Sequence, residues 1–391
     1  LLPIPGSPPS KTIEPGTIPP PKTLSNSLKP LVNLDILSIS ISLNNLDFLL
    51  CLMKIKLTIF IFFILTEVSF ASEVNVYTSR HYDTDENLYD LFTEETGIKV
   101  NIITAKGNAL IEKIKAEDSN TSADVFITVD AGNLWKLQKE GFFQSIESTE
   151  IKSTVPKRLR GPNDEWVGLA KRSRVIFYNP DKVSNDELDN LSYENLSDSK
   201  WKGRVAIRSS NNLYNQSLVA SLIAHNGIEK TEKWAKGLVN NFARKPQGND
   251  RAQIIAVANG EADIAIANSY YIGLMLSGEK GEAQKKAAMK VGLHFPNQKG
   301  RGTHINISGA GIIKHSKNKE NAEKFIEFLL SKKAQTHIIN NTYEYPILEN
   351  VKPHKNILIF GEDFKEDSLS VTNYGKFNPE AVKLMDRVGW Q

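Results

Sequence analysis

The chain has 391 residues, a formal net charge of +3 and a single cysteine, Cys51. This nearly balanced charge suggests no binding to nucleic acid. A single cysteine excludes a disulfide framework and a zinc site built on thiolates.

The first 71 residues divide into two segments of different composition. Residues 1–52 hold nine of the 17 prolines and no methionine, and we interpret them as a low-complexity or non-native upstream segment. Residues 53–71 begin with Met53 and two lysines, continue with the apolar run 57–65 and end in Ser69-Phe70-Ala71. This pattern predicts a secretory signal peptide.

Cleavage after Ala71 would leave residues 72–391, a stretch of 320 residues without cysteine and with 43 basic against 41 acidic residues. No cysteine follows the cleavage site to carry a lipid, and no later segment reaches the ~20 apolar residues of a membrane span. We therefore expect a monomer in the periplasm that is not membrane-embedded. This chain is longer than the length that a single hydrophobic core usually stabilises, so we expect two lobes.

Apolar runs alternate with amphipathic stretches after residue 72. This alternation predicts a doubly wound α/β fold. The expected strands are 74–79, 98–104 and 123–128, and the expected helices are 85–95, 108–118 and 132–140.

Two later segments are predicted to connect the lobes. The long strand-like run 168–180 would cross from the first lobe into the second, and the chain would return near residues 300–313. The first lobe would then comprise residues 72–172 plus 303–391, and the second lobe residues 173–302.

Tyrosines follow three runs that we interpret as strands, of which two, 204–208 and 262–269, lie in the later part of the chain. Tyr270 and Tyr271 end the apolar run 262–269, the run 74–80 leads into His81 and Tyr82, and the run 204–208 leads to Tyr214. Carboxyl ends of strands in an open α/β sheet are where ligands bind.

A single pair of tyrosines after a strand more often packs against neighbouring side chains than binds a ligand. The recurrence at three strand ends favours a shared ligand. A phenolate is a hard, anionic oxygen donor and suits a hard, highly charged cation, whereas zinc and Cu(I) favour cysteine and histidine. Fe(III) is the natural match.

Catalytic motifs are missing from residues 72–391. No GxxxxGK[ST], HExxH, GxSxG or GxGxxG pattern occurs, and the histidines have no partner at metal-ligand spacing. We therefore predict that the protein is not an enzyme. A secreted hydrolase or transferase that uses Asp and His remains the alternative from another class.

Residues 72–391 resemble the ferric-iron-binding proteins of bacterial ABC importers (FutA- and FbpA-type), which are transferrin-like class II periplasmic binding proteins. The resemblance implies two lobes, each a doubly wound sheet, with Fe(III) in the interlobe cleft. It also implies an inner-membrane ABC permease with its ATPase as partner. The motifs that carry it are residues 77–82 (YTSRHY), 123–126 (ADVF), 168–174 (GLAKRSR), 268–271 (NSYY) and 377–380 (FNPE).

The resemblance assigns the family's adjacent tyrosine ligands to Tyr270 and Tyr271 and its third tyrosine to Tyr214. The early His-Tyr step of the tyrosine-rich branch falls on His81 and Tyr82. Relatives that use a carboxylate and a bound anion have a glutamate shortly after the ADVF strand. Residues 127–130 read ITVD here, so the resemblance does not extend to a synergistic anion.

Four phenolates on Fe(III) would leave one excess negative charge. A nearby guanidinium would offset it, and Arg80 and Arg174 are the candidates. Ordinary salt bridges are the alternative role for both. Within the class of binding proteins, the alternative ligand is an organic cation such as a polyamine or thiamine, which would need several acidic side chains in the pocket.

Overall fold

The computed structural model describes residues 72–391 with the exception of 81–83 and 362. The predictions for residues 1–52 and 53–71, and for His81 and Tyr82, lie outside the described residues. In the part of the chain that is described, no helix is long and apolar enough to cross a membrane.

The first part of the chain forms three parallel strands in the order β2-β1-β3, joined by helices. This arrangement confirms the predicted alternation of strands and helices. The elements are β1 (Glu73–Thr78), α2 (Thr84–Thr96), β2 (Lys99–Thr104), α3 (Gly107–Glu117), β3 (Val125–Thr128), α4 (Ala131–Lys139) and α5 (Thr149–Thr154).

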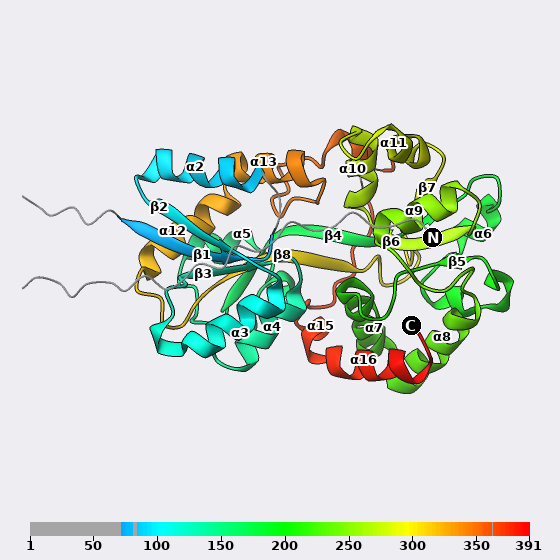
Figure 1. Ribbon diagram of the computed structural model, residues 1–391, viewed down its shortest axis with the longest axis horizontal. Coiled ribbons are helices and arrows are strands. Elements are labelled where there is room, and N and C mark those ends of the chain that lie inside the picture. The colour runs from blue at the N-terminus through cyan, green and yellow to red at the C-terminus, as the bar shows by residue number, and fades with distance from the viewer. Residues whose placement is uncertain (1–71, 81–83, 362) are drawn as a thin grey trace, which may run out of the picture. The chain divides into compact units, whose positions relative to one another are not determined.

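One long strand, β4 (Trp166–Tyr178), then changes partner along its length. Residues 166–173 pair antiparallel with β8 (Ile305–Ile312), and residues 174–178 pair antiparallel with β6 (Ile264–Asn268). Figure 1 shows β4 and β8 running between the two groups of helices. The predicted long strand is therefore present, and its change of partner falls between Ser173 and Arg174.

The remaining elements of the middle segment surround β6. They are α6 (Asn185–Asp189), β5 (Val205–Ala206), α7 (Leu213–Asn226), α8 (Ile228–Asn240), α9 (Asp250–Ala258), α10 (Tyr270–Ser277), α11 (Glu282–Ala288) and β7 (Gly292–His294). β5 pairs parallel with β6, and β7 pairs antiparallel with β4.

The buried apolar side chains form three clusters. The first lies around β1, β3 and α12 (Lys319–Leu330), whose buried face includes Phe325 and Ile326. The other two lie on opposite faces of β6, because successive side chains of a strand point to opposite sides. Ile264 and Ile266 belong to the second cluster, whereas Ala265 and Ala267 belong to the third.

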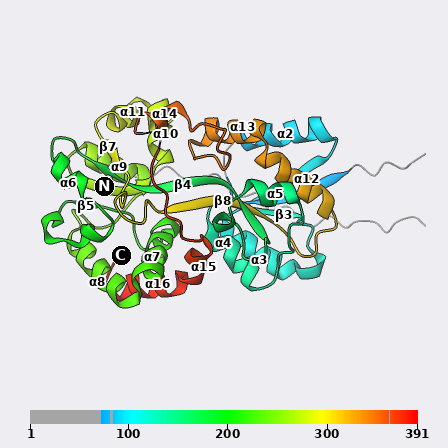
Figure 2. The ribbon, with the colours of Figure 1, turned by 180° about the vertical axis from the view of Figure 1, so that it is seen from behind.

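The chain ends with four helices after α12. They are α13 (Lys332–Thr342), α14 (Lys355–Leu358), α15 (Thr372–Lys376) and α16 (Asn378–Arg387). The terminal helix α16 packs Ala381, Leu384 and Met385 into the second cluster, although the sequence analysis places residues 303–391 in the first lobe. α16 packs against α7 and α8, and the three helices lie together in the view from behind (Figure 2).

Candidate metal centre

Three of the predicted tyrosines come together in the structure. Tyr270 and Tyr271 are the first residues of α10, directly after β6 and Ser269, and their ring centroids lie 4.2 Å apart. Tyr214 is the second residue of α7, and its hydroxyl oxygen lies 3.4 Å from that of Tyr270. Residues 56 positions apart in sequence therefore present adjacent phenols.

The local sequence explains why these phenols lie beyond the carboxyl ends of β5 and β6, which are parallel to each other. β6 is buried along its whole length, and α10 begins immediately after it. Asn212 accepts a hydrogen bond from the backbone of Asn215 at 3.3 Å and so starts α7 next to Tyr214. The helix starts thus place both sets of phenols at the edge where ligands bind.

Three guanidinium groups surround Tyr214. The Cζ atom of Arg172 lies 5.7 Å from the centroid of the Tyr214 ring and 5.9 Å from that of Tyr270. Arg174 and Arg208 each lie 5.9 Å from the Tyr214 ring centroid. These guanidiniums place positive charge beside the rings of two of the predicted ligands.

Two buried carboxylates hold these guanidiniums. Asp250 accepts from Nη1 of Arg174 at 2.7 Å and from Arg208 at 3.4 Å. Glu344 pairs with Arg172 at 3.1 Å. Arg174, which the sequence analysis proposes near the metal, is therefore both salt-bridged and close to a predicted ligand.

Arg80 belongs to the same charged network. Its Nε lies 2.8 Å from Asp85 and its Nη1 lies 3.6 Å from Glu344, which it shares with Arg172. The sequence analysis names Arg80 and Arg174 but misses Arg172 and Glu344. The alternation of β4 could have identified Arg172, because it lies two residues from Arg174 and on the same face.

The protonation of Tyr271 depends on its burial. Removal from water raises the pKa of this phenol above its ordinary value, and the nearby Asp250 carboxylate raises it further. At neutral pH the metal-free side chain therefore keeps its proton. A bound trivalent cation would have to displace that proton to form the phenolate.

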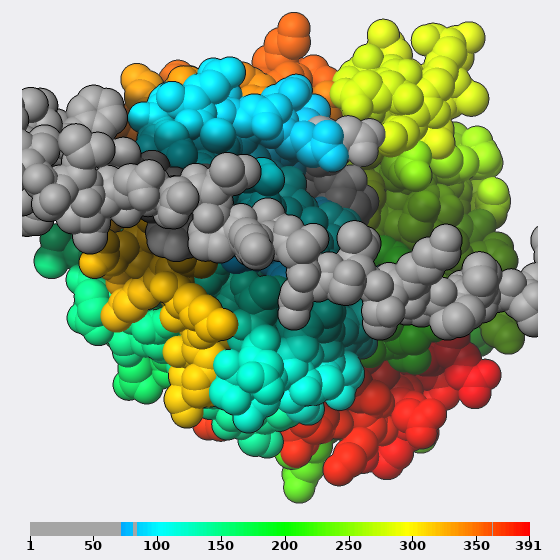
Figure 3. Space-filling model, turned by 60° about the vertical axis from the view of Figure 1, so that its left-hand side comes forward, coloured from blue at the N-terminus to red at the C-terminus, as the bar shows by residue number. Residues whose placement is uncertain are grey.

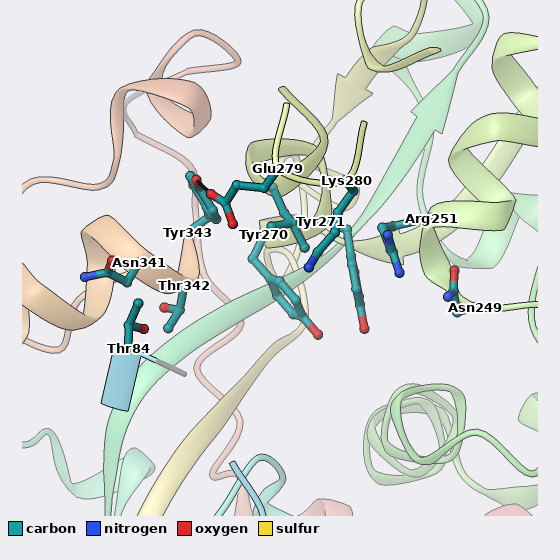
Figure 4. Close-up of a pocket in the computed structure, with 11 residues that line it drawn as sticks. Thr84, Asn249, Arg251, Tyr270, Tyr271, Glu279, Lys280, Asn341, Thr342 and Tyr343 are labelled. Atoms are coloured by element: carbon teal, nitrogen blue, oxygen red, sulfur yellow. Dashed lines mark hydrogen bonds between the residues drawn. The ribbon is translucent and has the colours of Figure 1, made fainter. Parts of the chain in front are cut away.

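A cavity of about 400 Å³ adjoins Tyr270 and Tyr271. Figure 4 shows the two tyrosines side by side, with the end of α13 on one side and Arg251 on the other. Glu279 is the one acidic side chain among the described lining residues, which also include the basic Arg251 and Lys280. This composition is unfavourable for a polyamine.

Groups of three or more histidine, cysteine, aspartate or glutamate side chains suited to a metal ion do not occur among the described residues. The candidate centre consists instead of the three phenols and the arginines around them.

Replacing Asp250 by asparagine should lower the free energy of unfolding by about 2 kcal/mol, because charge-assisted hydrogen bonds to buried Arg174 and to the backbone of Asn268 would weaken. Asp263→Asn provides the matched control, since its ion pair with Arg204 is partly exposed and should contribute less than about 1 kcal/mol. Denaturant unfolding of both variants measures the difference. Equal losses would contradict a special role for the buried pair.

Comparison with known proteins identifies the family. The profile of the bacterial extracellular solute-binding proteins matches residues 77–336. The chain belongs to this family. It is accordingly a solute-binding protein and not an enzyme.

Two iron-binding or iron-uptake proteins are similar to the chain over most of their length. The chain is 53% identical to iron uptake protein A1 of Synechocystis over 82% of this chain and 88% of the relative. It is 32% identical to the major ferric iron-binding protein of Neisseria meningitidis over 81% of this chain and 93% of that protein.

Solved structures show the same fold. The Trichodesmium FutA protein in complex with iron and citrate is 53% identical, with a TM-score of 0.79, over 82% of this chain and all of that one. The ferric binding protein of Campylobacter jejuni is 39% identical, with a TM-score of 0.76, over 81% of this chain and all of that one. The fold is therefore that of the two-lobe periplasmic binding proteins, as predicted.

Proposed function

We propose that this protein binds Fe(III) through tyrosine phenolates in the periplasm and delivers it to an ABC importer. The observation that carries the proposal is the convergence of Tyr214, Tyr270 and Tyr271 beneath three guanidinium groups. Phenolate oxygens suit a hard trivalent cation. The iron-binding functions named for the relatives agree with this chemistry.

The proposed ligand set comprises Tyr82, Tyr214, Tyr270 and Tyr271, with His81 as a further ligand. Four phenolates would give the ferric centre one net negative charge. Arg80 and Arg174 are the arginines that the sequence suggests for offsetting this charge. Arg172 would contribute as well, because its guanidinium lies over the rings of Tyr214 and Tyr270.

Two lobes are proposed to close on the metal, with residues 72–172 plus 303–391 in the first and residues 173–302 in the second. The hinge would lie where β4 exchanges β8 for β6, close to Arg172 and Arg174. Rotation about this point would bring His81 and Tyr82 to the other phenols and bury the metal. Within residues 303–391, α16 packs Ala381, Leu384 and Met385 against the second cluster, so this helix would connect the first lobe to the second in this scheme.

Export and delivery complete the proposal. Residues 53–71 would act as the signal peptide, cleaved after Ala71. The exported chain would act as a monomer and hand its iron to an inner-membrane permease powered by an ATPase. N-terminal sequencing of the exported protein would test the cleavage site.

A visible absorption spectrum of the purified chain tests the proposal most directly. Addition of one equivalent of a ferric chelate should give a coloured protein through phenolate-to-iron charge transfer. Spermidine and thiamine, added separately and followed by calorimetry, should give no binding heat. A colourless protein that binds either organic cation would overturn the ferric assignment.

A further inference from the structure

Tyr343, the residue directly after α13, has an unusual backbone conformation. Its φ of 61° and ψ of 15° lie in the left-handed region, which residues other than glycine rarely adopt. The residue is nevertheless buried and belongs to the third core cluster. A conformation with this cost persists where surrounding contacts impose it.

The ring of Tyr343 lies against the backbone of α10. A Cβ atom added at Gly273 would lie 2.8 Å from three atoms of the Tyr343 side chain, so only glycine fits there without a shift. Gly273 follows Tyr270 by three residues and therefore lies on the same side of the helix. Tyr343 thus contacts the surface of α10 that carries one of the proposed ligands.

A polar contact supplements this packing. The hydroxyl of Tyr343 donates to Oε1 of Glu279 at 2.7 Å, in the turn after α10. Asn356 donates from Nδ2 to the carbonyl oxygen of Gly273 at 3.1 Å, and the ring of His354 meets that of Tyr343 edge-on at 4.7 Å. The segment after α13 therefore holds both the middle and the end of α10.

These contacts also form a wall of the cavity beside the phenols. Tyr343 and Glu279 line it together with Tyr270 and Tyr271 (Figure 4). α13 has its buried side chains in the first cluster, whereas α10 belongs to the third. The orange surface of the α13 region and the yellow surface around α11 adjoin along the upper edge of Figure 3.

We propose that Tyr343 is a positioning residue for the phenol pair. Its ring sets the distance of α10 from α13 at Gly273, and its hydroxyl bond to Glu279 keeps α10 in the orientation that directs Tyr270 and Tyr271 toward the metal. The proposal rests on the proposed ferric function. Loss of the bond would let α10 move away from α13, and the bound metal would escape faster.

Tyr343→Phe and Glu279→Ala test the hydrogen bond without removing the ring. Transfer of iron to excess EDTA, followed as loss of the visible band, should be about two- to tenfold faster in both, which corresponds to one hydrogen bond of modest net strength. Glu279→Gln keeps an acceptor oxygen and should restore the slow rate. Tyr178→Phe, at the last position of β4, is the matched control and should release iron like the parent.

The double variant, Tyr343→Phe with Glu279→Ala, should release iron no faster than either single variant, because both remove the same bond. Gly273→Ala is an independent test of the same contact. The added methyl group would push α10 away from Tyr343 and should change the position or intensity of the charge-transfer band. Parental release rates in both single variants, or fully additive effects in the double variant, would overturn the proposal. A parent that gains no colour with ferric iron would instead reject the proposed function.

Discussion

Tyr271→Phe should remove much of the ferric charge-transfer absorption and lower the affinity for Fe(III) by more than about 100-fold. Changes to groups that only support metal ligands already cost 10–100-fold, and this substitution removes an anionic donor. Phenylalanine keeps the ring that stacks on Tyr270 at 4.2 Å, so the loss would reflect the missing oxygen and not lost packing. Competition against a ferric chelator, followed in the visible spectrum, measures the change.

Tyr270→Phe and Tyr214→Phe should act in the same direction, since their hydroxyls lie 3.4 Å apart and the Arg172 guanidinium lies over both rings. Tyr178→Phe is again the control, because it removes a phenol beside Ile264, at the end of β6 away from Tyr270 and Tyr271. Thermal unfolding of each variant separates loss of ligand from loss of fold. Parental affinity and colour in all three site variants would show that these tyrosines are core residues and would reject the ferric site.

Ferric affinity should fall steeply as the solution is acidified. Each phenol must lose a proton to bind, so each contributes about a tenfold loss of affinity per pH unit below its pKa. The three described phenols together predict that the ferric affinity falls about a thousandfold per pH unit. Tyr82, as a fourth ligand, would add another factor of about ten per pH unit. Burial raises the pKa of Tyr271, which keeps it protonated at neutral pH and ensures that its proton is released on binding.

Proton release can be measured in weak buffer with a pH-stat after addition of a ferric chelate, with correction for protons taken up by the freed chelator. About three or more protons per iron are expected. His81→Ala should flatten the mildly acidic part of the profile if the imidazole binds the metal, because that ring must be neutral to do so. Release of fewer than one proton per iron would contradict phenolate ligation.

Much of the fold could be predicted from periodicity. The strands at β1, β2 and β3 and the helices between them lie close to their predicted bounds, because their apolar spacing is a local property of the chain. β6 was recognised from its uninterrupted apolar residues, and with it the emergence of Tyr270 and Tyr271 at a strand end. β5 is shorter than the predicted run 204–208, since only Val205 and Ala206 pair with β6.

Reading along the chain could predict that three of the tyrosines lie together, but it could not predict the charged residues around them. Tyrosines that follow strands can be found by reading along the chain, and Tyr214, Tyr270 and Tyr271 do lie together. Arg172 was missed although it lies two residues from Arg174 on β4. Asp250 and Glu344 were missed because nothing local distinguishes a buried charge from a surface one. Their burial follows from the network in which each guanidinium finds its carboxylate.

Local residue patterns are enough to predict the alternation of strands and helices, the long strand β4 and the tyrosines that follow strands. Packing in three dimensions fixes which charges lie beside those tyrosines, where β4 changes partner and which hydrophobic cluster α16 joins. It also brought Tyr343 against Gly273. The periodicity of apolar residues and the type of a donor side chain can be identified from residues close together in the sequence. The contacts above join segments far apart in the chain, and they form only when the sheets and helices pack.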